Sequence, residues 1–281
     1  MLEKLIKLLF QLAACVSIAM VLLICVFLFA NGLPAIKEIG VIDFLFGREW
    51  KPGNGRFGIF PMIVGSIYVT LGAILVGVPI GILTAVFMAK FCDNGWYKIL
   101  KPAINLLAGI PSIIYGFFGL WVLVPFMRDT FVGSGKNILT ASILLGIMIL
   151  PTIINISETS LRAVPESYYQ GAVALGETHE KSIFRVVLPA AKSGILAGVI
   201  LGIGRAIGET MALIMVAGNQ KIVPESVFDG VRTLTGNIVL EMGYATDLHR
   251  DALIATAVVL FVFILVINLT FSILKSKGLK E

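Results

Sequence analysis

Six long apolar runs constrain this chain more than any other feature of its sequence. Each approaches or exceeds the length of about 20 residues that a helix needs to cross a bilayer, and none shows the alternation of a β-barrel strand. Only 14% of the residues are charged, whereas soluble domains average about 25%. We therefore predict an all-α polytopic membrane protein with six transmembrane helices. The runs cover residues 8–30, 61–89, 102–127, 138–157, 195–217 and 252–274.

The order of the runs suggests a division of the chain. Residues 1–60 are expected to form an N-terminal transmembrane helix and an extracytoplasmic loop, and residues 61–281 a core of five spans. The first run is too long for the apolar region of a signal peptide, which predicts an uncleaved helix. Pro111 and Pro125 predict a kink or break in the third run, because proline cannot donate a backbone hydrogen bond.

Basic residues suggest the orientation. Six spans place both termini on one side, and that side holds twelve of the 22 Lys and Arg residues, against nine on the other. Several of the twelve, such as Lys90, Lys98, Lys101 and Lys192, lie next to a predicted membrane edge, which favours cytoplasmic termini. The net charge of +5 is then a consequence of topology and requires no nucleic-acid partner.

The sequence contains no convincing cofactor motif. Residues 133–137 read Gly-Ser-Gly-Lys-Asn, but the upstream glycine of a P-loop is missing and Asn137 replaces the magnesium-binding Ser or Thr. Two histidines and three cysteines at unrelated spacings predict no metal site. We expect the chain to bind no cofactor, so that any ATP and Mg²⁺ would be used by a partner.

The loop at about residues 158–192 is expected on the cytoplasmic side and carries a helix–glycine–helix pattern. Pro165 suits the first turn of a helix, Gly176 suits the break after it, and Thr178 can cap a second short helix that ends near Pro189. Such a protrusion can dock into a groove of another protein. A hairpin that only holds the spans together is the alternative.

The fifth run carries two charges and a series of glycines. On a continuous helix, Gly194, Gly198 and Gly202 would share one face with Arg205 and Glu209. The glycine spacing permits close helix packing, and Gly204 and Gly208 form a neighbouring pair. Charges within a span usually face the bundle interior or a pathway. The alternative is a structural ion pair between Arg205 and Glu209, although arginine N-terminal to glutamate is the poorer orientation.

The loop resembles the "EAA" loop of ABC importer permeases. Gly176 is followed after nine residues by Val186 and then by Leu188-Pro189, as in that family. Gln170, Gly171 and Ala172 stand where the family has Glu-Ala-Ala, so two of the three leading positions differ. The resemblance implies a MetI-like type I permease fold. It also implies that these residues couple the chain to an ATPase subunit that hydrolyses ATP.

Three further strings are similar to phosphate-specific permeases. They are residues 204–212, Gly-Arg-Ala-Ile-Gly-Glu-Thr-Met-Ala; residues 108–116, which contain Gly-Ile-Pro-Ser; and Trp50-Lys51-Pro52, which resembles the PstC-type rather than the PstA-type subunit. The resemblance implies a phosphate path lined by Arg205, Glu209, Thr210, Ser112 and Tyr115. It also implies an inner-membrane location, a PstA-type second permease, an ATPase dimer and an extracytoplasmic phosphate-binding protein.

Phosphate chemistry is compatible with these side chains. A desolvated anion needs a positive partner, and the arginine fork matches two phosphate oxygens. Glu209 could accept the proton of a phosphate hydroxyl, or it could hold Arg205 when the site is empty. Phosphonate, sulfate or molybdate are alternative substrates, and a stand-alone channel, a secondary transporter or a phosphate sensor are alternative functions.

Overall fold

The computed structural model describes residues 2–131 and 133–277 and is almost entirely helical. In chain order the α-helices are α1 (Leu2–Ile39), α2 (Val41–Phe46), α3 (Phe60–Val86), α4 (Asn94–Gly109), α5 (Ser112–Phe118), α6 (Val124–Thr130), α7 (Ile138–Arg162), α8 (Glu166–Ala174), α9 (His179–Ser182), α10 (Leu188–Ala190), α11 (Lys192–Gly208), α12 (Met211–Val216), α13 (Leu234–Glu241) and α14 (Asp247–Lys277).

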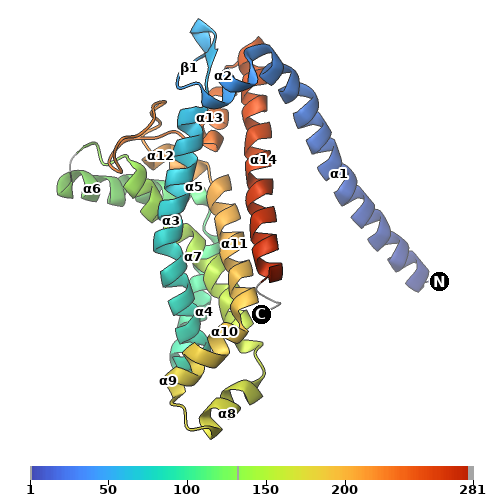
Figure 1. Ribbon diagram of the computed structural model, residues 1–281, viewed down its shortest axis with the longest axis vertical. Helices are drawn as coiled ribbons and strands as arrows, with labels where there is room; N and C mark the ends of the chain where they lie inside the picture. Colours follow the sequence, from blue (N-terminus) through green and yellow to red (C-terminus); the bar gives the residue numbers. More distant parts are fainter. Residues whose placement is uncertain (1, 132, 278–281) are drawn as a thin grey trace.

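Three wider π-helical segments and one small hairpin complete the described structure. The π-helical segments are η2 (Phe87–Phe91), η3 (Gly119–Leu123) and η4 (Ile183–Val187). Strands β1 (Trp50–Lys51) and β2 (Arg56–Phe57) pair antiparallel across the 3₁₀ turn η1 (Pro52–Asn54). This hairpin lies at the upper end of the molecule in Figure 1, and α8–α10 lie at the opposite end. We call these the hairpin end and the α8–α10 end.

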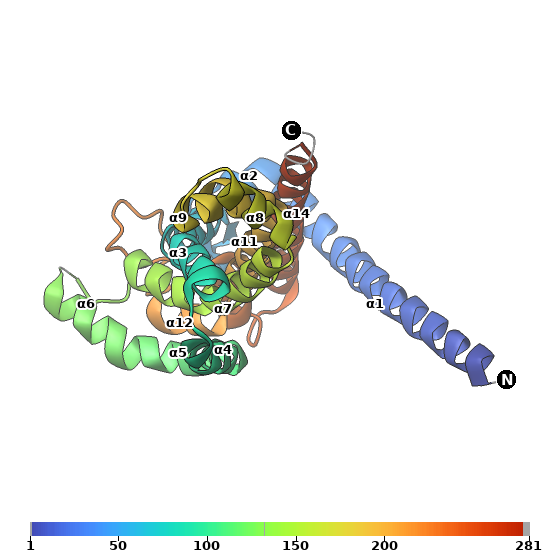
Figure 2. The ribbon, with the colours of Figure 1, turned by 90° about the horizontal axis from the view of Figure 1, so that it is seen from below.

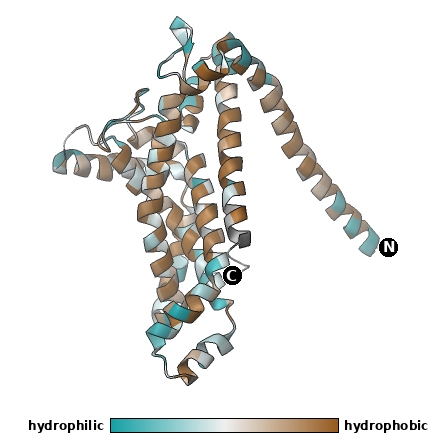
Figure 3. Cartoon of the chain, viewed as in Figure 1, coloured by the Kyte–Doolittle hydropathy of each residue, from teal (hydrophilic) through white to brown (hydrophobic). Residues whose placement is uncertain are grey.

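Within the described residues, five continuous helices are long and apolar enough to cross a membrane, and a sixth span is bent. The continuous spans are Glu3–Ile39, Phe60–Phe91, Ser112–Thr130, Ile138–Arg162 and Asp247–Thr270. The sixth joins His179–Ala190 to Lys192–Gly208 with a bend of 68°. Apolar residues form the middle of the long helices, and hydrophilic residues gather at the hairpin and at α8–α10 (Figure 3). The six-span prediction is confirmed with this bend included.

Helices α3, α7 and α11 form the centre of the bundle, and small residues let them approach closely. A Cβ on Gly77 would lie 2.8 Å from Ile149, and one on Gly81 would lie 2.8 Å from Ile153. Helix α14 packs on the outside, and most of α1 leans away from the bundle with its apolar side chains exposed (Figures 1 and 2). Only the last turns of α1 join the core, where Ala35 is buried and Gly32 lies against Val258 of α14.

The third apolar run is broken as predicted, but at only one of its two prolines. Helix α4 ends at Gly109, and the extended Pro111 is the N-cap of α5. The span therefore runs over Ser112–Thr130, later than the expected 102–127. Pro125 does not end the helix, because the π-helical turn η3 widens it just before the proline. Pro189 follows η4 in the same way.

Candidate functional site

Arg205 lies in the last turn of α11 and is partly exposed on the side of the bundle. Its guanidinium is 3.5 Å from the Thr152 hydroxyl of α7, where Nη1 donates. Nothing in the described chain pairs this arginine with a carboxylate. A charge in this position is costly unless a partner neutralises it.

The alternative of a helical ion pair between Arg205 and Glu209 is not what the structure shows, because the two residues do not share a helix. Helix α11 ends at Gly208, and Glu209 has the extended backbone angles φ −69° and ψ 134°. Its carboxylate turns to the next helix, where Oε1 accepts from the backbone N–H groups of Thr210 at 3.0 Å and Ala212 at 3.2 Å. Glu209 therefore caps α12, and the fifth span is not the continuous helix 195–217.

The break at Glu209 is fixed by contacts with other helices. Thr235 of α13 donates its hydroxyl proton to the Glu209 carbonyl at 3.0 Å. Helix α12 also lies very close to α5, since a Cβ on Gly116 would be 3.0 Å from the Cα of Ala212. The Thr210 hydroxyl donates to the Gly208 carbonyl at 3.2 Å. The two-residue break thus exposes Arg205 and Glu209 without loosening the fold.

The other predicted path residues lie on α5. Tyr115 is buried, and its hydroxyl donates to the Leu107 carbonyl of α4 at 2.8 Å. This bond spans the break at Pro111 and holds α4 beside α5. Ser112 is partly exposed at the start of α5. The Tyr115 hydroxyl is therefore occupied by a structural hydrogen bond, whereas the side chains of Arg205 and Ser112 are partly exposed.

Helices α4 and α7 add polar side chains that the sequence reading missed. Asn155 lies one turn beyond Thr152 on α7, and its Nδ2 donates to Asn105 Oδ1 of α4 at 3.2 Å. Lys101 Nζ donates to Asn155 Oδ1 at 2.9 Å. We call Arg205, Thr152, Asn155, Asn105 and Lys101 the polar row. The spacing of Thr152, Asn155 and Thr159 in an apolar run was the available signal, because it marks one face of a helix.

The predicted packing glycines divide into two groups. A Cβ on Gly194 would lie 2.1 Å from the Ser160 hydroxyl, one on Gly198 would lie 3.1 Å from Ile156, and one on Gly202 would lie 2.9 Å from Ile153. All three partners belong to α7. A Cβ on Gly204 or Gly208 would meet nothing within 4 Å in the described chain. The second pair therefore borders the open side near Arg205.

The loop between the fourth and fifth spans has the helix–glycine–helix form that its sequence predicts. Pro165 precedes α8, Gly176 has φ +89°, and the Thr178 side chain accepts from the Lys181 backbone N–H at 3.4 Å. Positive φ at Gly176 explains the glycine, because side chains disfavour this region. The Tyr169 hydroxyl and His179 Nδ1, 2.9 Å apart, join the two sides of the turn.

The motif residues of this loop differ in exposure. Gln170, Gly171 and Gly176 are exposed, whereas Ala172 is buried. Val186, Leu188 and Pro189 form the second arm, and Leu188 packs on the core at this end of the bundle. Leu175, between the arms, is 89% exposed. An apolar tip on a rigid turn is suited to contact another protein.

A buried carboxylate organises the hairpin end. Glu241 is 2% exposed, and its Oε1 lies 2.5 Å from both Lys221 Nζ and Arg232 Nη1. Its Oε2 accepts from Trp50 Nε1 at 2.8 Å and lies 3.0 Å from His249 Nε2. One side chain therefore ties together the hairpin, the loop before α13, and α14.

Stability should depend on the charge of Glu241. Burial raises its pKa, but hydrogen bonds from Lys221, Trp50 and Arg232 outweigh burial and lower the pKa from 4.5 to about 2. A lowered folded-state pKa stabilises the protein above the unfolded value, and this contribution, about 3 kcal/mol, disappears as the pH falls from about 4.5 to about 2. Glu241→Gln should lower the melting temperature at pH 7, and this difference from wild type should shrink with acidification.

Glu225→Gln provides the matched control, because Glu225 is exposed on the neighbouring loop. Thermal unfolding in detergent at pH 7 and at pH 3 measures both variants against wild type. Equal melting temperatures for the two variants at pH 7 would contradict the stabilising role of Glu241.

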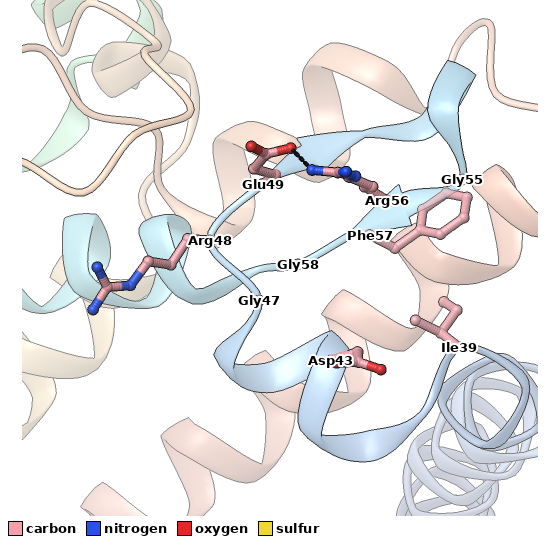
Figure 4. Close-up of a pocket in the computed structure, with 9 residues that line it drawn as sticks. All are labelled: Ile39, Asp43, Gly47, Arg48, Glu49, Gly55, Arg56, Phe57 and Gly58. Carbon is pink, nitrogen blue, oxygen red and sulfur yellow. Dashed lines mark hydrogen bonds and ion pairs between the residues drawn. The ribbon is translucent and has the colours of Figure 1, made fainter.

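A cavity of about 480 Å³ lies beside the hairpin. Figure 4 shows the Glu49–Arg56 ion pair along one side of it and Asp43 on the opposite side. Arg48 and Arg56 are balanced by Asp43 and Glu49 among the lining residues. The cavity therefore has no excess charge to attract an anion, unlike the surroundings of Arg205.

The fold and the site define a membrane protein of the permease class, with a helix–glycine–helix loop at one end and a charged, interrupted span. The chain belongs to the family of binding-protein-dependent transport system inner membrane components, whose sequence profile matches residues 77–277. The chain is 41% identical over 266 residues to the probable ABC transporter permease protein YqgH of Bacillus subtilis strain 168, covering 91% of this chain and 86% of that protein. The phosphate transport system permease protein PstC of Mesorhizobium japonicum is 36% identical, with 85% and 79% covered.

Solved structures show the same fold. A bacterial alginate ABC transporter superposes with a TM-score of 0.63 at 15% identity, covering 93% of this chain and 92% of that chain. The inward-facing MetNI methionine ABC transporter gives 0.60 at 19% identity, covering 82% and 99%. The MetI-like architecture expected from the sequence is therefore confirmed. Such identities support the fold alone.

Proposed function

We propose that this chain is the PstC-type permease subunit of an ABC importer that translocates inorganic phosphate. The observation that carries the proposal is Arg205, which lies at the break of a membrane span and has no carboxylate partner among the described residues. Its fork can take two phosphate oxygens, and a Cβ on the neighbouring Gly204 or Gly208 would meet nothing within 4 Å in the described chain. Two relatives are named as phosphate transport system permease proteins, and phosphate is the substrate proposed here.

The open side of the bundle supports a second permease as partner. Gly204, Gly208 and the polar row all lie at a surface that the described chain leaves uncovered. A homologous PstA-type subunit placed there would enclose the row between two proteins, with Glu209 and Thr210 at its outer part. Enclosure matters because lipid cannot solvate a charged arginine and its anion.

The remaining partners follow from the two ends of the molecule. The α8–α10 end would face the cytoplasm together with both termini and dock on a dimer of ATPase subunits. The hairpin end would receive an extracytoplasmic phosphate-binding protein. This chain would bind no nucleotide or metal, and the ATPase subunits would use ATP and Mg²⁺. The apolar tip at Leu175 and the rigid turn at Gly176 support the docking role.

Reconstituted vesicles test the function directly. The complete complex, with loaded binding protein outside and ATP inside, should accumulate radioactive phosphate, and leaving out any one partner should abolish accumulation. Sulfate, molybdate and a phosphonate, each offered in excess, should leave phosphate uptake nearly unchanged.

Two results would contradict the proposal. Uptake of another oxyanion but not of phosphate would identify a different substrate. ATP-independent uptake by this chain alone would identify a channel or a secondary transporter.

A further inference from the structure

The polar row does not end at Arg205 but continues along α7 toward the α8–α10 end. Arg205 contacts Thr152, and Asn155 follows three residues later, about 4.5 Å further along the helix. Lys101 contacts Asn155 and also Glu158, whose Oε2 is 2.6 Å from Lys101 Nζ. A second cation therefore lies on the same side of the bundle, beyond the arginine.

The charges around Glu158 do not cancel. This carboxylate is 2% exposed and binds two cations, Lys101 and Arg162, the latter through Nε at 2.8 Å. The Tyr97 hydroxyl adds a neutral hydrogen bond at 2.7 Å. One negative and two positive charges leave an excess of one positive charge. In a poorly solvated environment such an excess favours the arrival of an anion.

Lys101 is better placed than Arg162 to meet that anion. The Arg162 side chain is 46% exposed, but its guanidinium also donates to the Met88 carbonyl at 2.8 Å and lies 4.6 Å from the centre of the Tyr97 ring. These contacts hold it on the side of η2. Lys101 is 27% exposed and points along the row between Asn155 and Glu158.

The amides beside Lys101 complete a set of donors. An ammonium has three N–H groups, and Asn155 and Glu158 account for two of them. Asn155 donates one amide N–H to the side-chain oxygen of Asn105, and the amide N–H groups of Asn105 are not used in that hydrogen bond. One lysine N–H and several amide N–H groups thus remain for an oxyanion. Because Glu158 partly offsets the lysine charge, such a site would hold the anion less tightly than Arg205.

We propose that Lys101, Asn105 and Asn155 form an inner anion site that receives phosphate after it leaves Arg205. This inference rests on the proposed function and adds a second binding step on the cytoplasmic half of the path. A weaker site beyond a stronger one shortens the distance over which the anion is unpaired. It also permits release, since neutral amides provide part of the binding.

Lys101→Gln is the decisive variant, and Arg162→Gln is its matched control. Each removes one positive charge and one partner of Glu158. If the inner site exists, Lys101→Gln should reduce the maximal rate of phosphate uptake about tenfold, by loss of a charged hydrogen bond. The KM for loaded binding protein and subunit co-purification should stay unchanged. Arg162→Gln should remain within about twofold of wild type, and Lys101→Arg should keep most of the rate.

Asn105→Leu covers the case in which Lys101→Gln fails to assemble, since it removes amide donors and leaves Glu158 untouched. It should also lower the maximal rate at unchanged KM. An unchanged rate in Lys101→Gln would overturn the inner site, and so would an equal loss in Lys101→Gln and Arg162→Gln. Where Lys101→Gln fails to assemble, an unchanged rate in Asn105→Leu would overturn it. Wild-type uptake in the same vesicles separates this failure from failure of the proposed function, which would show as no phosphate uptake at all.

Discussion

Arg205→Lys should reduce phosphate uptake about 10- to 100-fold while the complex still assembles. Lysine keeps the charge but loses the fork that can bind two oxygens of one anion, and each charged hydrogen bond contributes about 1.5–3 kcal/mol. Assembly should survive because Arg205 makes no ion pair within the described chain, so no structural charge pair is disturbed. Uptake and subunit co-purification are measured side by side.

Arg128→Lys is the matched control for this substitution, because Arg128 is exposed and its one ion pair within the described residues is with the adjacent Asp129. It should transport at the wild-type rate. A double replacement of Arg205 and Glu209 by apolar residues distinguishes a substrate contact from a structural ion pair. Near-normal uptake in that double variant would show that Arg205 does not contact the substrate.

Glu209→Gln belongs in the same series, because glutamine can still accept the backbone N–H groups that Glu209 caps. Helix α12 should therefore remain intact, and loss of transport would report the missing charge. Sulfate inhibition of phosphate uptake in this variant would support proton acceptance from phosphate. Lost transport with unchanged selectivity would instead favour a role in release or gating.

Gly176→Val should uncouple ATP hydrolysis from transport without preventing membrane insertion. Gly176 has φ +89°, and a β-branched residue in that region costs about 1–3 kcal/mol. A Cβ would meet nothing within 4 Å, so the penalty comes from the backbone alone. The turn should relax, displace Leu175, and reduce phosphate-stimulated ATP hydrolysis about tenfold or more.

Gly95→Val is the control for this second variant. Gly95 lies in the first turn of α4, its Cβ would also meet open space, and its φ is not positive. Phosphate should stimulate ATP hydrolysis normally in this variant. In Gly176→Asn the stimulation should lie between wild type and Gly176→Val, because asparagine tolerates positive φ. Normal stimulation in Gly176→Val would mean that this turn does not couple the chain to an ATPase.

Much of this protein could be read from sequence because the relevant signals are local. Apolar run length predicts the presence of spans, since a helix in a bilayer must satisfy its backbone internally and carry apolar side chains whichever neighbours it has. Pro165, Gly176 and Thr178 predict their turn because capping and positive φ involve only neighbouring residues. Arg205 was recognised for the same reason, because a charge within a span is conspicuous without any knowledge of its surroundings.

Only the tertiary structure decided how the charged groups are partnered. Glu209 leaves the helix because Thr235, 26 residues later, holds its carbonyl, and a helical wheel cannot include that contact. Lys101 meets Asn155 across 54 residues, and Trp50 meets Glu241 across 191. Electrostatic interactions depend on distance in space and on desolvation. The sequence alone therefore determined that the chain has six apolar spans and approximately where they lie. The packing of distant helices decided where the third and fifth spans begin and end and which charged groups lack an oppositely charged partner in the described chain.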